Sequence, residues 1–113
     1  MVQTDWYTAK HTCLDAGLRL LQINTAAKQS LVNAVLNTEQ VNGLIWIGLS
    51  DAALEGQWRW ADGSLALYTN WGGCLANSVA NNCAHIVGID YNLRYKWVAD
   101  NCIEFRDFIC ETY

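Results

Sequence analysis

Apolar positions near the start of the chain recur at helical spacing. The residues that share this helical face are Trp6, Ala9, Cys13 and Ala16. Because they stand three or four positions apart, the pattern predicts a helix from Trp6 to Ala16. Thr4 or Asp5 is suited to cap its start, and Gly17 is suited to end it.

A second helical pattern follows directly. It runs from about Thr25 to Leu36, with Thr25 as the expected cap. The residues expected on its buried stripe are Ala27, Leu31, Ala34 and Val35. The first third of the chain is therefore expected to contain two helices.

After Asn42-Gly43 the pattern changes to short apolar segments separated by turn residues. The expected strands are Leu44–Leu49, Gln57–Trp60, Ala66–Trp71, Cys83–Ile89, Lys96–Val98 and Phe108–Glu111. Helices first and strands afterwards, without βαβ alternation, predict an α+β domain with antiparallel sheets. Residues 72–82 show neither period and read as a long loop, a kind of segment that often carries function.

Length and composition narrow the class of protein. A chain of 113 residues is expected to form one domain, spanning residues 1–113. No apolar run approaches the ~20 residues of a membrane-spanning helix. Seven basic and 11 acidic residues give a net charge of −4, with no basic cluster to neutralise phosphates, so nucleic acid is not an expected partner.

Five cysteines in a chain of this size favour an oxidising compartment. We expect a secreted, extracellular domain whose signal sequence is absent from this stretch. Five cysteines can form two disulfides with one thiol left over in fifteen ways, and spacing alone does not choose among them. The alternative to a secreted protein is a cytosolic one in which the thiols are reduced.

Several motifs together resemble the C-type lectin-like domain. The matching elements, in chain order, are Trp6-x-x-Ala9-x-x-x-Cys13 with Gly17, Leu20-x-x-Ile23, Trp46-Ile47-Gly48-Leu49, Trp58-x-Trp60-x-Asp62-Gly63, Asn70-Trp71, Cys83, Trp97-x-x-x-x-Cys102 and Phe108-Ile109-Cys110-Glu111. They cover nearly the whole chain. The resemblance implies two helices packed on short antiparallel sheets, with a long loop region and disulfide staples. Members usually carry a strand before the first helix, for which only Met1 to Thr4 are present here.

Tryptophans dominate these motifs, and their spacing gives them a structural reading. Trp58 and Trp60 alternate with Arg59, so both indoles lie on one face of a strand. In the segment Trp46-Ile47-Gly48-Leu49, glycine marks a close backbone approach at the centre of the core. No binding role is assigned to these tryptophans.

The resemblance also implies two disulfides, Cys13 to Cys110 and Cys83 to Cys102. On the chain-entropy argument the first stabilises the fold by roughly 4 to 5 kcal/mol and the second by roughly 3 kcal/mol. Cys74 is then unpaired within the long loop, which makes a disulfide-linked homodimer through Cys74 one hypothesis and an inert thiol the other. Comparing the chain with a Cys74→Ser variant on a non-reducing gel separates the two.

Sugar-binding members hold calcium with a Glu-Pro-Asn or Gln-Pro-Asp triplet, a further acidic residue and a Trp-Asn-Asp triplet. This chain has Cys74-Leu75-Ala76-Asn77 and Trp97-Val98-Ala99 at those places, and it contains no proline. Calcium needs six to eight oxygen ligands, yet no Asp or Glu occurs from Gly63 to Ile89. Asp100 and Asn101 lie just beyond the position of the second triplet and are at most a displaced remnant of it. A calcium-mediated site is therefore not expected.

Zinc is a weaker candidate cofactor. His11 and Asp15 stand four apart on one face of the first expected helix, a spacing that suits two ligands. His85 lies after the long loop and Cys74 lies within it. The alternative is that His11 is an exposed residue paired loosely with Asp15 and that His85 only packs.

No catalytic motif is present, so the chain is not expected to be an enzyme. The favoured function is calcium-independent glycan binding, and the resemblance suggests a secreted, innate-immune lectin acting at microbial surfaces. The candidate contacts are Asn70, Asn77, Asn81, Asn82, Tyr91, Asn92, Arg94, Tyr95, Asp100 and Asn101. The alternative is a protein-binding domain that uses the same surface, with Leu75, Val79, Tyr91, Leu93, Arg94 and Tyr95 as contacts.

Overall fold

The structure is a computed structural model that describes residues 3–72 and 80–113. Its elements, in chain order, are α1 (Trp6–Asp15), β1 (Arg19–Leu20), α2 (Ala26–Thr38), β2 (Leu44–Ser50), β3 (Arg59–Trp60), β4 (Cys83–Val87), β5 (Trp97–Asp100), β6 (Asp107–Phe108) and β7 (Cys110–Glu111). The α+β class and the two leading helices are confirmed. None of the helices within the described ranges is long and apolar enough to cross a membrane.

Both helices begin where the sequence places a cap. The Asp5 carboxylate accepts a hydrogen bond from the Thr8 backbone N–H at 3.2 Å, so Asp5 caps α1. The Thr25 hydroxyl accepts one from the Lys28 N–H at 3.1 Å and caps α2. After α1, Gly17 takes a φ of 76°, a left-handed conformation that favours glycine and ends the helix.

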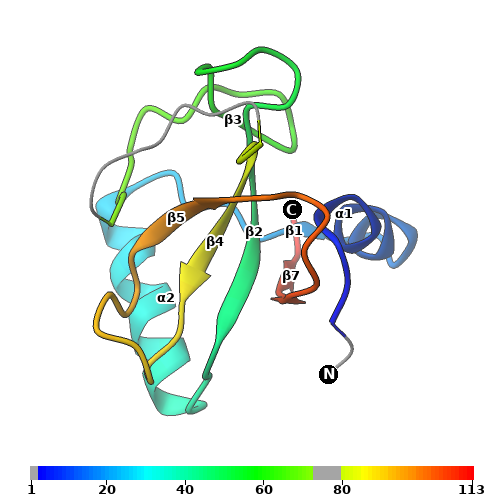
Figure 1. The fold of residues 1–113 in the computed structure, drawn as a ribbon. Helices are drawn as coiled ribbons and strands as arrows, with labels where there is room; N and C mark the ends of the chain where they lie inside the picture. The colour runs from blue at the N-terminus through cyan, green and yellow to red at the C-terminus, as the bar shows by residue number, and fades with distance from the viewer. Residues whose placement is uncertain (1–2, 73–79) are drawn as a thin grey trace.

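The main sheet has the order β3-β2-β4-β5 with antiparallel neighbours, and β6 adds a parallel pairing to β2. A separate two-stranded sheet pairs β1 with β7. Figure 1 shows α2 to the left of β2 and α1 with β1 and β7 to its right, and α2 also contacts β7, since Lys28 Nζ lies 2.6 Å from Glu111 Oε1. Successive side chains of β2 point to opposite faces of the sheet and so enter two different hydrophobic clusters. Ile45 and Ile47 pack into the core below α2, whereas Trp46 packs with α1.

Two glycines allow close backbone approaches. A Cβ on Gly48 would lie 3.1 Å from the Leu20 carbonyl oxygen, and the Gly48 N–H donates to the Leu21 carbonyl at 2.8 Å. A Cβ on Gly88 would lie 2.7 Å from the Val41 carbonyl oxygen. Gly48 therefore lies at the close approach that its motif predicts, and Gly88 brings the end of β4 against the turn before β2.

The tryptophans form the centre of the larger core. The ring centroids of Trp60 and Trp97 lie 5.5 Å apart, and those of Trp58 and Trp71 lie 4.9 Å apart, both edge to face. Trp58 and Trp60 are buried. This agrees with the structural reading of these residues.

Two disulfides cross-link the fold. The Cys13–Cys110 bond connects α1 to β7, and the Cys83–Cys102 bond connects β4 to the segment after β5. These are the pairs that the family resemblance implies. Cys74 lies outside the described residues, so the hypothesis of a dimer through this thiol stays a prediction.

The expected face of α2 is wrong. Leu31 and Val35 are 68% and 56% exposed, whereas the buried residues of the helix are Gln29, Val32 and Leu36. The buried face is offset because the Gln29 amide is satisfied inside the protein. Its Oε1 accepts from the Trp97 indole N–H at 3.0 Å, and its Nε2 donates to Asn33 Oδ1 at 2.8 Å.

Strand lengths also depart from the expectation. Residues 66–71 form no strand, and Trp71 makes only an isolated bridge to Trp97. The expected C-terminal strand is split at Ile109, because β6 pairs with β2 in the main sheet and β7 pairs with β1 in the other. The expected segment Gln57–Trp60 is a strand only over β3.

Candidate ligand-binding site

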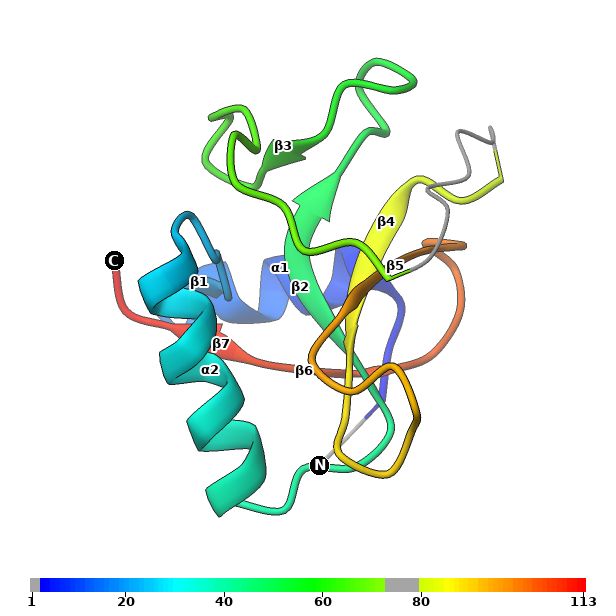
Figure 2. The ribbon, with the colours of Figure 1, turned by 90° about the vertical axis from the view of Figure 1, so that its left-hand side faces the viewer.

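The hairpin between β4 and β5 forms the wall of a surface groove. Figure 2 shows this hairpin beside the turn that precedes β2, at one end of the molecule. The Gly88 N–H donates to the Gly43 carbonyl at 2.7 Å, and the Gly43 N–H donates to Asp90 Oδ1 at 2.9 Å. The turn and the hairpin are thereby held together.

Tyr95 anchors the other side of the hairpin. Its φ of 71° is unusual for a bulky residue, and contacts on both sides of its peptide maintain it. The Tyr95 N–H donates to the Val87 carbonyl at 2.7 Å, and its own carbonyl accepts from Asn70 Nδ2 at 2.9 Å. Gln29 Nε2 reaches the same carbonyl at 3.3 Å. The hairpin is therefore fixed to the core rather than suspended from two strands.

The groove has a volume of about 560 Å³. Its lining residues are Leu44, His85, Val87, Tyr91, Asn92, Leu93 and Val98. Adjacent strands bring several of them to one face, since Leu44 pairs with Val87 and His85 pairs with Val98. Tyr91 and Leu93 of the hairpin are each 48% exposed. The groove is thus an apolar cleft of a size suited to a small ligand.

A chain of polar contacts backs the groove at His85. The imidazole is 6% exposed, and its Nδ1 lies 2.8 Å from Asp100 Oδ2. The same carboxylate oxygen accepts from Arg106 Nε at 3.0 Å. Burial acts to raise the pKa of Asp100, but hydrogen bonds and charges from His85 and Arg106 outweigh it and hold this pKa below its ordinary value. The carboxylate is therefore ionised, and Nδ1 carries the proton that it donates.

The expected contact residues divide into two groups. Tyr91 and Asn92 line the groove, and Arg94 lies exposed in the same hairpin. Asp100, Asn101 and Tyr95 instead support the scaffold: the Asn101 N–H donates to Asp100 Oδ1 at 2.7 Å, and Asn101 Oδ1 accepts from the Ile103 N–H at 3.1 Å.

The candidate contact residues in or near the long loop do not line the groove within the part of the chain that the structure describes. Asn77 lies outside the described residues, as do Leu75 and Val79. Asn81 and Asn82 are partly exposed, and the Asn82 carbonyl accepts from the Ser50 hydroxyl and the Asp51 N–H, so its backbone closes the end of β2. Asn70 is held by Lys96 Nζ, which donates to its Oδ1 at 3.1 Å.

The zinc candidates belong to different elements. His11 and Asp15 are exposed on α1, whereas His85 is buried on β4. Over residues 3–72 and 80–113, no group of three or more His, Cys, Asp or Glu side chains is placed to hold a metal ion. A zinc site that includes Cys74 stays a prediction, since Cys74 is outside those ranges.

Sequence reasoning did not identify the aliphatic floor of the groove or Arg106. A usable signal was present for the floor, because His85 and Val87 alternate along β4 and must therefore share a face. For Arg106 no local pattern exists, since its contact with Asp100 depends on the turn after β5.

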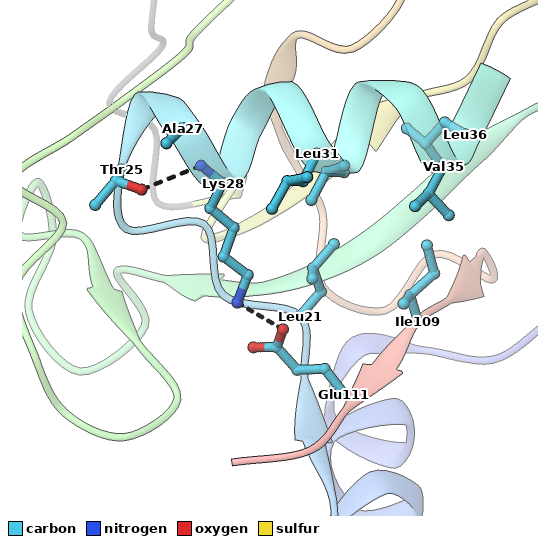
Figure 3. A pocket seen from close by; sticks show the side chains of 10 residues that line it. Leu21, Thr25, Ala27, Lys28, Leu31, Val35, Leu36, Ile109 and Glu111 are labelled. Atoms are coloured by element: carbon cyan, nitrogen blue, oxygen red, sulfur yellow. Dashed lines mark hydrogen bonds and ion pairs between the residues drawn. The ribbon is translucent and has the colours of Figure 1, made fainter. Parts of the chain in front are cut away.

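A second groove, of about 460 Å³, runs between α2 and the small sheet (Figure 3). Leu31 and Val35 of the exposed helix face line it together with Leu21 and Ile109. Its charged groups are already paired, since Lys28 Nζ lies 2.6 Å from Glu111 Oε1. Arg19 Nε lies 2.9 Å from Glu111 Oε2, so this groove offers a ligand few free polar contacts.

Comparison with known proteins places the chain in a family. The profile of the Lectin C-type domain matches residues 2–112, so the chain belongs to this family. CD209 antigen of Homo sapiens is 30% identical, over 96% of this chain and 26% of its own length. Lectin BRA-3 of Megabalanus rosa is 29% identical, over 96% of this chain and 65% of its own length. The chain thus spans about a quarter of the CD209 relative.

Solved structures agree with this assignment. The carbohydrate-recognition domain of the mouse scavenger receptor C-type lectin superposes with a TM-score of 0.81 at 29% identity, covering 97% of this chain and 81% of that one. A calcium-independent type II antifreeze protein superposes with a TM-score of 0.81 at 24% identity, covering 96% of this chain and 78% of that one. The second likeness shows the shared fold alone.

Proposed function

We propose that this domain is a secreted, non-catalytic recognition module that binds glycans, including those of microbial surfaces, without a calcium-mediated site. Its binding surface is the β4–β5 hairpin with the groove that it covers. An extracellular location agrees with the two disulfides. Several relatives carry the word lectin or carbohydrate-recognition domain in their names, which supports a glycan ligand.

The hydrogen bonds that Asp100 already makes are the main support for proposing that binding is independent of calcium. Val98 and Ala99 occupy the β5 positions at which the family places Asn and Asp ligands, and neither side chain has an oxygen. Asp100 follows them, but its Oδ2 already accepts from His85 and Arg106 and its Oδ1 from the Asn101 N–H. Calcium would have to displace all three donors to use this carboxylate, and it needs several further oxygens.

The non-catalytic part rests on the surroundings of His85. The imidazole and Asp100 are arranged as a base and its orienting carboxylate. However, no hydroxyl or thiol in the described part of the chain forms a hydrogen bond with His85 Nε2, so the pair has no nucleophile to activate there.

A glycan array probed with and without a chelator tests the proposal. We expect binding that persists in EDTA, because no step depends on the metal. Tyr91→Ala should weaken binding about tenfold by removing the exposed ring against which a sugar face can pack. Tyr7→Ala is the matched control, since Tyr7 is 45% exposed on α1, far from the hairpin in sequence and element. Binding that disappears in EDTA would contradict the proposal.

Protein recognition is the second candidate function, and the composition of the groove favours it. Exposed Tyr91 and Leu93 beside an aliphatic cleft are typical of surfaces that accept an apolar side chain. Silence of the wild-type protein across the glycan array in the presence and absence of calcium would favour this function.

A further inference from the structure

A third groove lies between α1, the loop after β2 and the turn after β3, and we call it the α1–β3 groove. Its walls include Tyr7 and Lys10 of α1, Ala52 and Ala53 of the loop, and Arg59 of β3. Its volume of about 240 Å³ is small for a drug-sized ligand and suits a single ring. None of the described residues that line it is acidic, although the chain has a net charge of −4. The groove is therefore a local positive site on an acidic protein.

Arg59 is held at this groove with most of its hydrogen-bond donors unused. Its Nε donates to Gln57 Oε1 at 3.1 Å, and its Nη1 donates to the Gly63 carbonyl at 2.6 Å. A guanidinium has five N–H donors, so the remaining ones are available to a ligand. Because the two existing bonds already fix the planar fork, an oxyanion that binds it immobilises little further side-chain freedom.

Lys10 supplies the second positive charge. Its Nζ lies 5.7 Å from the centroid of the Trp6 ring, a cation–π contact that holds the ammonium group beside α1. Over residues 3–72 and 80–113, neither Lys10 nor Arg59 forms an ion pair. Both cations are thus available to an anionic ligand.

The acidic residues next to the lining residues in sequence are engaged elsewhere. Asp51 is 2% exposed, and its Oδ2 accepts from the Gly56 N–H at 2.8 Å. Asp62 Oδ1 accepts from the N–H and the hydroxyl of Ser64 at 2.9 and 2.6 Å. Asp62 Oδ2 accepts from Gln22 Nε2 at 3.1 Å. Neither carboxylate lines the groove, so an external anion meets no close negative charge there.

The rest of the groove wall is apolar. Tyr7 is 45% exposed and offers its ring to a ligand, and Ala52 and Ala53 add exposed methyl groups. A small inorganic anion would use only the two cations. A ligand that also carries a ring would cover the apolar wall, because aromatic rings pack favourably edge to face or offset against a tyrosine. The lining therefore favours a ring and an oxyanion in one molecule.

We propose that the α1–β3 groove binds small aromatic acids, that is, planar rings that carry a carboxylate or sulfate group. The oxyanion accepts hydrogen bonds from Arg59 and Lys10, and the ring packs against Tyr7 and the two alanines. The groove shares no lining residue with the β4–β5 groove. This second site is therefore independent of the proposed glycan binding.

Amide chemical-shift titration by NMR with three small probes tests the ligand class. Phenyl sulfate carries both the ring and the charge, methyl sulfate carries the charge alone, and benzyl alcohol carries the ring alone. We expect phenyl sulfate to bind at least about fivefold more tightly than either of the others and to shift the amides of residues 7–10, 52–53 and 59–61. Added salt should weaken phenyl sulfate binding more than benzyl alcohol binding. Equal affinities for phenyl sulfate and benzyl alcohol, or shifts confined to the β4–β5 hairpin, would overturn the proposal.

Two variants test the cations. Lys10→Gln and Arg59→Gln should each weaken phenyl sulfate binding about fivefold and leave benzyl alcohol binding unchanged. Lys28→Gln removes the same charge on α2, away from the groove, and is the matched control. Lys10→Gln breaks no hydrogen bond or ion pair in the described ranges, so it tests the site even where loss of the Gly63 contact destabilises Arg59→Gln. Unchanged phenyl sulfate affinity in Lys10→Gln would overturn the proposal.

Tyr7→Ala tests the apolar wall and separates this site from the hairpin. It should weaken phenyl sulfate binding several-fold and leave glycan binding in EDTA unchanged. An unchanged phenyl sulfate affinity would overturn the aromatic part of the ligand class. A sulfotyrosine tripeptide that binds more tightly than phenyl sulfate would overturn the assignment to a small molecule and identify a protein side chain instead. Phenyl sulfate binding by a protein that is silent on the glycan array would support this site and contradict only the proposed function.

Discussion

Asp100 directly follows Val98 and Ala99, the β5 positions at which the family places calcium ligands, and its neighbours determine its role. His85 and Arg106 both donate to its Oδ2, and the side chain is 14% exposed. A charged, largely buried carboxylate with three donors stabilises the structure around β4 and β5. It also fixes the tautomer of the imidazole in the groove.

Replacing Asp100 should therefore cost stability in a pH-dependent way. Because its folded-state pKa is lowered, the ionised group stabilises the protein above its unfolded pKa, and this contribution is lost as pH falls through the folded value. We expect Asp100→Asn to reduce the free energy of unfolding by about 1–3 kcal/mol at pH 7. The reduction should shrink as pH is lowered below about 4.

Urea denaturation of the two proteins between pH 7 and pH 2.5 measures this difference. Asp15→Asn, an exposed carboxylate on α1, is the control and should change stability by less than about 0.5 kcal/mol. A loss for Asp100→Asn that is the same at both ends of the pH range would contradict the assigned ion pair.

At the scale of elements, the helices, their caps and the α+β order are predictable from spacing alone. Caps and periodicity are local, so Thr25 and the start of α2 could be read from the sequence. The buried face of α2 could not. Gln29 is polar, and its place in the core depends on the indole N–H of Trp97, which lies 68 residues away in the chain. Hydropathy alone therefore favours the wrong stripe.

The orientation of α2 gives a prediction with an internal control. Leu36 is fully buried and Leu31 is 68% exposed on the same helix, so the two changes to Ala alter helix propensity equally. Leu36→Ala should lower the free energy of unfolding by about 2–5 kcal/mol, and Leu31→Ala by no more than about 0.5 kcal/mol. Chemical denaturation of both variants checks this. Similar losses for both would mean that the exposed stripe is covered in the folded protein.

At the scale of the whole molecule, two disulfides and a tryptophan-rich core form a cross-linked scaffold. The scaffold carries the groove beside the β4–β5 hairpin. The family motifs predict this scaffold because each of them serves packing or a bridge. The groove could be predicted only in part. Tyr91 and Asn92 follow from their place in an exposed turn, whereas Leu44, His85 and Val98 meet only through strand pairing.

Metal-free glycan recognition at this groove is the central claim, and amide chemical-shift mapping by NMR tests it most directly. In EDTA, we expect the glycan bound most tightly on the array to shift the amides of β4 and of residues 91–98. The amides of α1 should not move. Shifts that appear only after calcium is added, or that fall outside the hairpin and its neighbouring strands, would contradict the claim.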